Sequence, residues 1–316
     1  MNHRSGFVNI LGNPNTGKST IMNALVGERL SIITSKAQTT RHRIMGIVNG
    51  EGFQIVYSDT PGILHPRYKL QETMMNLVRT ALADADVILY VTDVKEKLLA
   101  DMEFPGKIKS SGIPVIVAVN KIDLSNQDDL SKIVEVWHDF FPDSPVIPVS
   151  ALKKFNLEPL LNAILSKLPE GEPFFPKDQL TDKYERFFAS EILREKILKN
   201  YQKEVPYSVE TEIESFKDEP EIIRIMALIH VARDSQKGII IGHKGAMLKK
   251  VGTEARHDME DFFGKKVNLK FGSDEPQKVK SAVKKETIPT KSAKSSKIAD
   301  PYEKIIIEEL GGREIN

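Results

Sequence analysis

Apolar segments of strand length alternate with longer amphipathic segments over the first half of the chain. Helical periodicity follows the first glycine-rich turn over Ser19–Val26 and recurs at Lys69–Leu82, Asp128–Phe140 and Leu157–Leu168. Such an alternation predicts an α/β domain with a doubly wound, mostly parallel six-stranded sheet. The expected strands are Phe7–Leu11, Ile44–Val48, Phe53–Ser58, Val87–Thr92, Pro114–Val119 and Val146–Val149.

Two features of the pattern refine this sheet. The segments 87–91, 115–119 and 146–149 are nearly continuous apolar runs, which are typical of central strands covered on both faces. Gly50-Glu51-Gly52 forms a short turn between the second and third apolar segments. We therefore expect a hairpin there, and hence one antiparallel strand in an otherwise parallel sheet.

The second half of the chain has a different order of elements. A cluster of helix- and strand-breaking residues, Pro169–Pro176, separates the halves. After it, the pattern predicts a smaller α+β domain with the order helix, strand, strand, helix, helix, strand. Its elements are a helix at Tyr184–Asn200, strands at Tyr207–Ser215 and Ile222–Ala232, helices ending at Ile241 and Phe263, and a strand at Val267–Phe271. The expected divisions are residues 1–172, 173–272 and a lysine-rich, disordered tail at 273–316.

Composition limits the classes of protein that remain. The 316 residues suit about two domains at ~150 residues each, and a net charge of +1 restricts any nucleic-acid surface to a local patch. The absence of cysteine excludes disulfides and thiolate metal sites, and it fits a reducing cytosol. Because no apolar run approaches the ~20 residues of a membrane span, we expect a cytoplasmic protein.

A phosphate-binding loop lies between the first strand and the first helix. Gly12-Asn13-Pro14-Asn15-Thr16-Gly17-Lys18-Ser19 matches the pattern GxxxxGK[ST] in every fixed position. A glycine-rich turn at a helix N-terminus directs several backbone N–H groups at one anion. Lys18 is expected to reach the β- and γ-phosphates, and Ser19 to bind Mg²⁺. The nucleotide-binding residues predicted here are Gly12, Asn13, Asn15, Thr16, Gly17, Lys18, Ser19 and Thr20.

Asp59-Thr60-Pro61-Gly62 follows the third strand, at the same predicted sheet edge. Asp59 can hold Mg²⁺, and the Gly62 N–H can contact a γ-phosphate and respond to its loss. The preceding segment 35–43 contains two threonines that could bind Mg²⁺ only while GTP is present. Thr40 is favoured over Thr39 as that ligand. The alternative is an ordinary polar loop.

Asn120-Lys121-Ile122-Asp123 follows the fifth strand and Ser150-Ala151-Leu152 the sixth. The two carboxylate oxygens of Asp123 match the N1–H and N2 amino donors of guanine, a pair that adenine lacks. Asn120 can tie the loop together, and the stem of Lys121 can lie on the base. Backbone N–H groups of Ser150, Ala151 and Leu152 can reach the guanine oxygen. These motifs predict GTP and GDP as the nucleotides.

Gly242-His243-Lys244-Gly245 lies between two predicted helices of the second domain. The glycines allow RNA to run close to the backbone, and Lys244 supplies positive charge. Ile240, Ile241 and Met247 either line a groove for bases or belong to the core. Lys249 and Lys250 are either phosphate contacts or part of a solvated face. The RNA-binding residues predicted here are Gly242, His243, Lys244, Gly245, Lys249 and Lys250.

Over residues 6–270, the set GNPNTGKST, KAQTTRHR, DTPG, NKID, SAL and GxxG resembles the Era family of Ras-like GTPases. The resemblance implies a Ras-like GTPase domain followed by a type II KH domain. It also implies hydrolysis of GTP to GDP and phosphate, binding to the 3′ end of small-subunit (16S) ribosomal RNA, and a role in 30S subunit assembly. The alternative is an RNA-binding assembly factor in which nucleotide regulates affinity and hydrolysis is incidental. We further expect a monomer, either purely cytoplasmic or peripherally associated with the inner membrane.

The sequence departs from common GTPase patterns at two places. Ile63 occupies the position at which many small GTPases have a glutamine that orients water, so hydrolysis is expected to be slow. In related GTPases with an apolar residue there, an asparagine at the position of Asn15 helps to coordinate K⁺; the resemblance thus implies K⁺-stimulated hydrolysis, unless Asn15 only shapes the turn. The expected catalytic set is Lys18, Asn15, Thr40 and Gly62. After Phe271 the family pattern is lost, and the tail lysines either bind RNA or are solvated.

Overall fold

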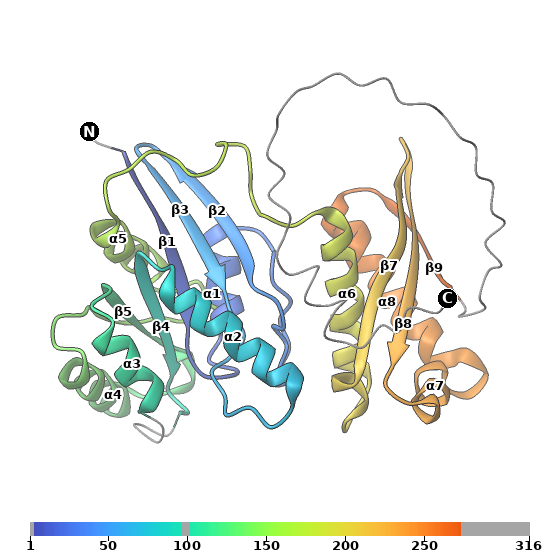
Figure 1. Cartoon of the computed structure of the whole chain (residues 1–316), viewed down its shortest axis with the longest axis horizontal. Coiled ribbons are helices and arrows are strands. Elements are labelled where there is room, and N and C mark those ends of the chain that lie inside the picture. Colours follow the sequence, from blue (N-terminus) through green and yellow to red (C-terminus); the bar gives the residue numbers. More distant parts are fainter. Residues whose placement is uncertain (1–2, 97–101, 273–316) are drawn as a thin grey trace, which may run out of the picture. The chain divides into compact units, whose positions relative to one another are not determined.

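The structure of the protein is a computed structural model that describes residues 3–96 and 102–272. Its first sheet has the strand order β2-β3-β1-β4-β5-β6, and every pairing is parallel except that of β2 with β3 (Figure 1). The predicted doubly wound sheet with one antiparallel strand is therefore confirmed. The strands are β1 (Arg4–Leu11), β2 (Ile44–Gly50), β3 (Phe53–Asp59), β4 (Val87–Asp93), β5 (Val115–Asn120) and β6 (Val146–Pro148).

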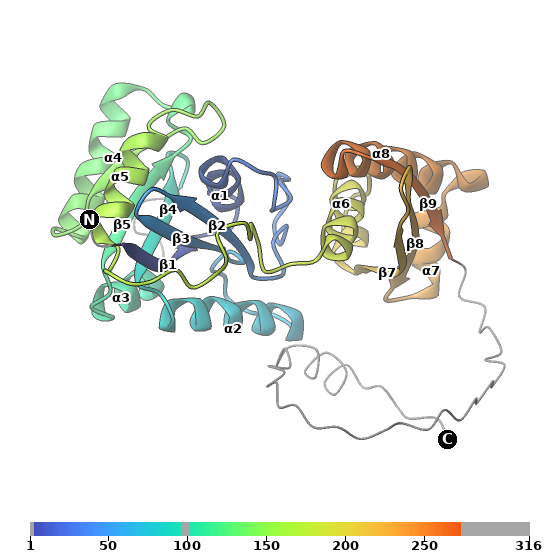
Figure 2. The same ribbon diagram turned by 90° about the horizontal axis from the view of Figure 1, so that it is seen from above.

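Helices cover both faces of this sheet. Leu160 and Ile164 of α5 and Ile21 and Met22 of α1 share one buried cluster with the inward side chains of the strands. On the opposite face, α2, α3 and α4 pack in a second cluster. Figure 2 shows α1 and α2 on opposite sides of the strands. The helices are α1 (Lys18–Val26), α2 (Lys69–Ala83), α3 (Glu103–Ser110), α4 (Gln127–Phe140) and α5 (Leu157–Lys167), with a short 3-10 helix at Ile122–Leu124.

The structure corrects two predictions about this domain. The prediction that 146–149 is a central strand is wrong, because β6 is an edge strand of three half-buried residues. Pro148 fits an edge, since it has no N–H to donate. Helix α3 was not predicted, because Pro105 and Gly106 weaken its pattern, although Phe104 and Ile108 are buried one turn apart.

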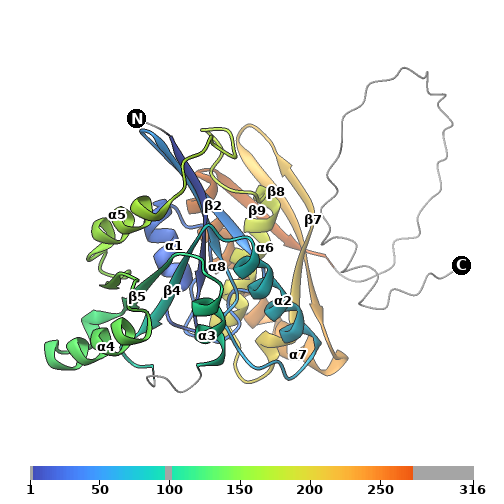
Figure 3. The same ribbon diagram turned by 60° about the vertical axis from the view of Figure 1, so that its left-hand side comes forward.

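The second domain pairs a three-stranded sheet with helices, as predicted. Strand β8 pairs antiparallel with β7 and parallel with β9. Helices α6 and α8 pack on the same face of this sheet (Figures 1 and 3). The elements are α6 (Glu185–Asn200), β7 (Val209–Asp218), β8 (Ile222–Val231), α7 (Asp234–Ile241), α8 (Ala246–Phe263) and β9 (Lys266–Phe271), with 3-10 helices at Val205–Tyr207 and His243–Gly245. The predicted tail lies outside the described residues.

The segment between α5 and α6 runs along the free edge of β2. The Ile47 N–H donates to the Leu180 carbonyl at 2.8 Å, and the Thr181 hydroxyl donates to the Met45 carbonyl at 2.7 Å. Fully buried Gln54 accepts the N–H groups of Phe174 and Phe175. The segment therefore satisfies edge groups of the sheet that would otherwise lack partners.

Candidate functional site

A cavity of about 500 Å³ lies at the carboxyl ends of β1, β3 and β5. This edge of an open α/β sheet is where such folds bind ligands, and the volume lies in the usual range for a small-molecule site. Predicted residues from five separate segments meet here. They are Asn15, Gly17, Lys18, Ser19, Thr20, Thr40, Gly62, Asn120, Lys121, Asp123 and Leu152. The runner-up Thr39 also lines the cavity.

The backbone of the phosphate loop requires its glycines. Gly12 has φ +148°, and a Cβ atom there would lie 2.1 Å from the Val91 carbonyl oxygen. Gly17 has φ +96°, and a Cβ atom would lie 2.2 Å from the Asn120 side-chain nitrogen. The hydroxyl of Thr16 donates to the Asn13 carbonyl at 3.0 Å and closes the turn. These contacts and backbone angles therefore define the shape of the loop.

Lys18 is almost completely buried beneath this loop. Its Nζ donates to the carbonyls of Gly12 at 3.0 Å and Asn13 at 2.7 Å. Burial lowers the pKa of Lys18 to about 8, although the Asp59 and Glu96 carboxylates favour the charged form. A bound phosphate would add further negative charge beside this ammonium.

Nucleotide affinity is expected to fall as the pH rises above about 8. A bound phosphate raises the pKa of Lys18, so above the pKa of the free protein binding has to take up a proton. The affinity should then drop by up to about tenfold per pH unit. Titration calorimetry near pH 9 in two buffers of different ionisation enthalpy measures this proton uptake. The Lys18→Arg variant, whose guanidinium stays charged, is the control; an equal pH slope in both proteins would assign the effect to another group.

Three oxygen-bearing side chains converge beside Lys18. The Ser19 hydroxyl donates to Asp59 Oδ2 at 2.6 Å and lies 3.0 Å from Thr40 Oγ1, and Thr40 donates to Asp59 at 3.4 Å. Asp59 is fully buried, burial raises the pKa of its carboxyl, and its Oδ1 makes no hydrogen bond to the described residues. A buried carboxylate beside two hydroxyls is a donor set suited to Mg²⁺.

The two candidate threonines differ in their contacts. The Thr39 hydroxyl lies 2.7 Å from that of Thr34 and donates to the Lys36 carbonyl at 2.6 Å. These bonds occupy it within its own loop, whereas Thr40 faces Ser19 and Asp59. The geometry thus favours Thr40 as the metal ligand.

The turn 59–62 lies directly against the phosphate loop. A Cβ atom on Gly62 would approach the Pro14 backbone to 2.7 Å, and the Ile63 N–H donates to the Gly12 carbonyl at 3.1 Å. The Thr60 hydroxyl donates to the Ile10 carbonyl at 2.7 Å, and Pro61 follows it in the turn. Ile63 is buried with Leu11 and Met75, so its side chain packs in the core. Of residues 59–63, only Gly62 lines the cavity.

Asn120 joins the two ends of the cavity. Its amide nitrogen donates to the Thr16 carbonyl at 2.9 Å, and its oxygen accepts the Ala151 N–H at 3.1 Å. Asp123 accepts the Ser150 hydroxyl at 2.6 Å, which orients its carboxylate. Leu152 is 75% exposed at the rim. The predicted guanine-recognition residues therefore form one hydrogen-bonded unit.

Two acidic residues that the motifs did not indicate also belong to the site. Asp93, the last residue of β4, accepts the Lys121 ammonium at 2.5 Å, and Lys121 also donates to the Asn15 carbonyl. Glu96 accepts the Asn13 side chain and the Thr92 hydroxyl. Asp93 could have been inferred from the sheet order. Strand β4 lies between β1 and β5, so its last residue ends beside the phosphate loop and Asn120.

The predicted RNA-binding loop forms a tight turn between α7 and α8. Gly242, Lys244 and Gly245 have φ values of +70°, +50° and +77°, a conformation that favours glycine. His243, Lys244, Lys249 and Lys250 are exposed. Ile240 is buried in the core, while Ile239 and Ile241 are exposed beside the loop. Of the apolar neighbours left open above, Ile240 is therefore core, and Ile241 is accessible to a ligand.

A nucleotide site at the carboxyl edge of an α/β sheet, followed by a domain with this GxxG turn, defines a GTPase with an appended KH domain. Residues 7–121 match the family model of the 50S ribosome-binding GTPase, and residues 204–275 match that of the KH domain. GTPase Era of Clostridium acetobutylicum is 43% identical over 270 residues, which span 85% of this chain and 91% of that protein. GTPase Era of Geotalea daltonii is 43% identical over 269 residues, or 84% and 91% of the two chains. This chain belongs to the GTPase Era family.

Two solved structures extend the comparison to three dimensions. One is a crystal structure of Era in complex with MgGDPNP and nucleotides 1506–1542 of 16S ribosomal RNA, with a TM-score of 0.81 and 39% identity over 85% of this chain and 92% of that one. The other is a variant of Aquifex aeolicus Era bound to GDP and AlF4⁻, with a TM-score of 0.81, 40% identity and the same coverage. The predicted family, with a Ras-like domain followed by a KH domain, is therefore confirmed. Over residues 3–96 and 102–272, no helix has the length and apolarity of a membrane span.

Proposed function

We propose that this chain is a GTP-hydrolysing switch that binds small-subunit ribosomal RNA and acts in 30S subunit assembly. The observation that carries the proposal is that one chain joins a preformed guanine-nucleotide cavity to an exposed, basic GxxG turn. The likeness to Era in complex with MgGDPNP and 16S ribosomal RNA supports the 3′ end of that RNA as the ligand. Hydrolysis of GTP would then convert the GTP-bound state of the protein to a GDP-bound state with a different affinity for RNA.

Within the cavity the residues divide by task. Lys18 and the loop N–H groups would bind the phosphates, while Asn120 and Asp123 would select guanine. Ser19, Thr40 and Asp59 would hold Mg²⁺, which supplies positive charge where the transferring phosphoryl group builds negative charge. The N–H of Gly62 would contact a γ-phosphate, a role supported by the close approach of its turn to Pro14 of the phosphate loop.

Binding to a 16S 3′-end RNA in the presence of GDP or a non-hydrolysable GTP analogue tests this proposal. We expect the affinity for the 3′-end RNA to exceed that for a scrambled RNA, and to differ between the two nucleotides. Equal binding to both RNAs would exclude sequence recognition. Equal binding with both nucleotides would exclude the switch.

A second candidate is an assembly factor in which nucleotide regulates RNA affinity and hydrolysis is incidental. The buried, apolar Ile63 favours it, since this residue offers no polar group to orient water. A Lys18→Ala variant that still supports subunit assembly in cells would favour this candidate over the first.

GTP hydrolysis is expected to be slow and to rise about tenfold when Na⁺ is replaced by K⁺. The side chain of Asn15 is exposed at the cavity, on a backbone with φ +65°, where an added cation could stabilise transition-state charge. Multiple-turnover rates in matched K⁺ and Na⁺ buffers measure the effect. The Asn15→Ala variant should lose the difference while retaining GDP affinity. Equal rates of the unmodified protein in both salts would refute the role.

Two further proposals concern the oligomeric state and the localisation of the protein. We propose a monomer, which sedimentation of the free protein at several concentrations tests. Peripheral association with the inner membrane stays a prediction, for which flotation with vesicles of acidic phospholipids is the measurement.

A further inference from the structure

Helix α6 carries four charged side chains that are almost fully buried. Glu191, Arg194, Glu195 and Lys196 are 4%, 3%, 1% and 8% exposed. A buried charge is costly unless it is paired and hydrogen-bonded. The partners of these side chains therefore show what the helix is built to contact.

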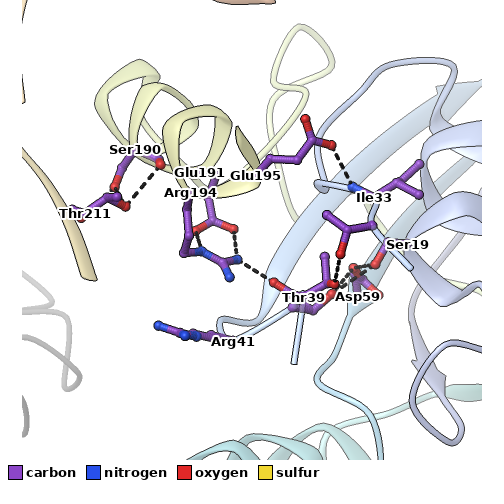
Figure 4. A network of polar contacts seen from close by, with 12 residues as sticks. Ser19, Ile33, Thr39, Arg41, Asp59, Ser190, Glu191, Arg194, Glu195 and Thr211 are labelled. Atoms are coloured by element: carbon purple, nitrogen blue, oxygen red, sulfur yellow. Dashed lines mark hydrogen bonds and ion pairs between the residues drawn. The ribbon is translucent and has the colours of Figure 1, made fainter. Parts of the chain in front are cut away.

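Two of the four side chains bond directly to the backbone of the switch segment, which we define as residues 33–43. Arg194 Nη2 donates to the Thr39 carbonyl at 2.5 Å, and Glu195 Oε1 accepts the Ile33 N–H at 3.2 Å (Figure 4). Both contacts are to main-chain groups, so they fix the path of the segment itself. The segment is thus held at two points by one helix of the second domain.

Arg194 is itself fixed in position. Its Nε and Nη2 donate to the two carboxylate oxygens of Glu191 at 2.7 and 2.6 Å, a bidentate geometry (Figure 4). Burial would raise the pKa of Glu191, but the Arg194 guanidinium outweighs it and holds that pKa below its usual value. The pair therefore presents Nη2 to Thr39 as a rigid donor.

The residue that Arg194 holds adjoins the proposed metal ligand. Neighbouring Cα atoms are about 3.8 Å apart, and the Thr39 carbonyl belongs to the peptide plane that leads into Thr40. Fixing this carbonyl therefore restricts where the Thr40 hydroxyl can point. It points to Ser19 Oγ, at 3.0 Å.

Arg41 ties the other side of Thr40 to the second domain. Its guanidinium donates to the carbonyls of Val209 at 3.0 Å, Tyr207 at 2.9 Å and Pro206 at 3.4 Å. Arg41 Nε and Arg194 Nη1 are buried and make no hydrogen bond to the described residues. Each of the two guanidinium groups that flank Thr40 therefore keeps one buried donor unused, while its other donors hold the switch segment against the second domain.

We propose that Arg194 is a positioning residue of the GTPase site, which places Thr40 at the magnesium position by holding the Thr39 carbonyl. The inference rests on the proposed role of Thr40 as a Mg²⁺ ligand. Because coupling is reciprocal, GTP with Mg²⁺ strengthens the contact between the switch segment and α6 by the same factor. GDP, which does not engage Thr40, leaves the contact unchanged.

Binding of fluorescent GDP and a fluorescent non-hydrolysable GTP analogue, both with Mg²⁺, tests the proposal. The main variant is Arg194→Met with Glu191→Leu, which removes both charges so that no carboxylate is left unpaired. Arg194→Lys keeps the charge but not the forked reach, and it remains informative if the double variant does not fold. Arg256→Met is the control, because Arg256 is a half-buried cation of the same domain whose ion pair with Glu260 lies within α8 and involves neither α6 nor the switch segment.

We expect the double variant to bind the GTP analogue about tenfold more weakly, to need more Mg²⁺ for it, and to bind GDP unchanged. Arg194→Lys should show a smaller loss of the same kind, and Arg256→Met none. Added to Thr40→Ala, the double variant should have no further effect, because the group it positions is gone. Additive losses, or equal losses for GDP and the GTP analogue, would overturn the proposal. If Thr40→Ala leaves binding of the GTP analogue unchanged, the proposed role of Thr40 as a Mg²⁺ ligand is wrong. If Thr40→Ala weakens binding but the Arg194 variants do not, the positioning role of Arg194 is wrong and the role of Thr40 stands.

Discussion

Replacing Asp123 with asparagine is expected to move the nucleotide preference of this GTPase from guanine to xanthine. The carboxylate accepts two donors from guanine, and an amide in its place offers one acceptor and one donor. The donor would face the N2 amino group of guanine, whereas xanthine has a carbonyl oxygen there. Since an unmatched polar pair in a recognition site costs several orders of magnitude, we expect GTP affinity to fall by about a thousandfold.

Competition between GTP and XTP for a fluorescent nucleotide measures this change. XTP should bind the Asp123→Asn variant at least as well as GTP does. The hydrogen bond from Ser150 at 2.6 Å holds the side chain in place, so the variant amide keeps a defined orientation. Asp128→Asn, a change of the same kind on the exposed start of α4, should leave both affinities unaltered. Unchanged GTP selectivity in Asp123→Asn would show that another group reads the base.

The motifs of the nucleotide site could be read from the sequence for a topological reason. In a parallel sheet, the carboxyl ends of the strands meet at one edge. Finding Gly17, Asp59 and Asn120 each just after an apolar segment therefore placed them together before any coordinates were known. Because these residues lie close together at that edge, their side chains can hydrogen-bond to one another's loops, as Asn120 does to Thr16.

What the sequence missed depends on contacts between residues far apart in the chain. Arg194 and Thr39 are 155 positions apart, and Arg41 and Val209 are 168 apart. Arg194, Thr39 and Arg41 look in the sequence like polar residues on a helix or loop, and no local period marks them as buried. In particular, the apolar positions of α6 predict only the helix itself, whereas four of its charged side chains, Glu191, Arg194, Glu195 and Lys196, are buried as well.

The choice between Thr39 and Thr40 also depends on contacts that the sequence does not show, although these two residues are neighbours in the chain. Both residues have the chemistry to bind Mg²⁺, and the sequence only ranked them. The structure separates them by hydrogen bonds, which occupy Thr39 with Thr34 and Lys36 and leave Thr40 beside Asp59. The switch segment thus has one threonine that bonds within its own loop and one that faces Ser19 and Asp59.

Reversing the charge of the GxxG turn is expected to weaken RNA binding about a hundredfold without unfolding the second domain. In the double variant His243→Asp with Lys244→Asp, two carboxylates replace side chains predicted to contact the RNA backbone, and each would repel phosphate. Both positions are exposed, and aspartate tolerates the left-handed conformation of Lys244 at φ +50°. The loss of RNA affinity should therefore reflect repulsion of the RNA and not unfolding of the second domain.

Fluorescence anisotropy with a 16S 3′-end RNA measures the loss, and GTP hydrolysis in the absence of RNA should not change. The matched control is Lys132→Asp with His138→Asp, the same pair of substitutions at exposed positions on α4. A loss confined to the GxxG variant at both low and moderate salt assigns RNA binding to this turn. If both variants weaken RNA binding equally, and if added salt abolishes this loss of affinity, then RNA binds through the overall charge of the protein. The GxxG turn is then not the binding surface.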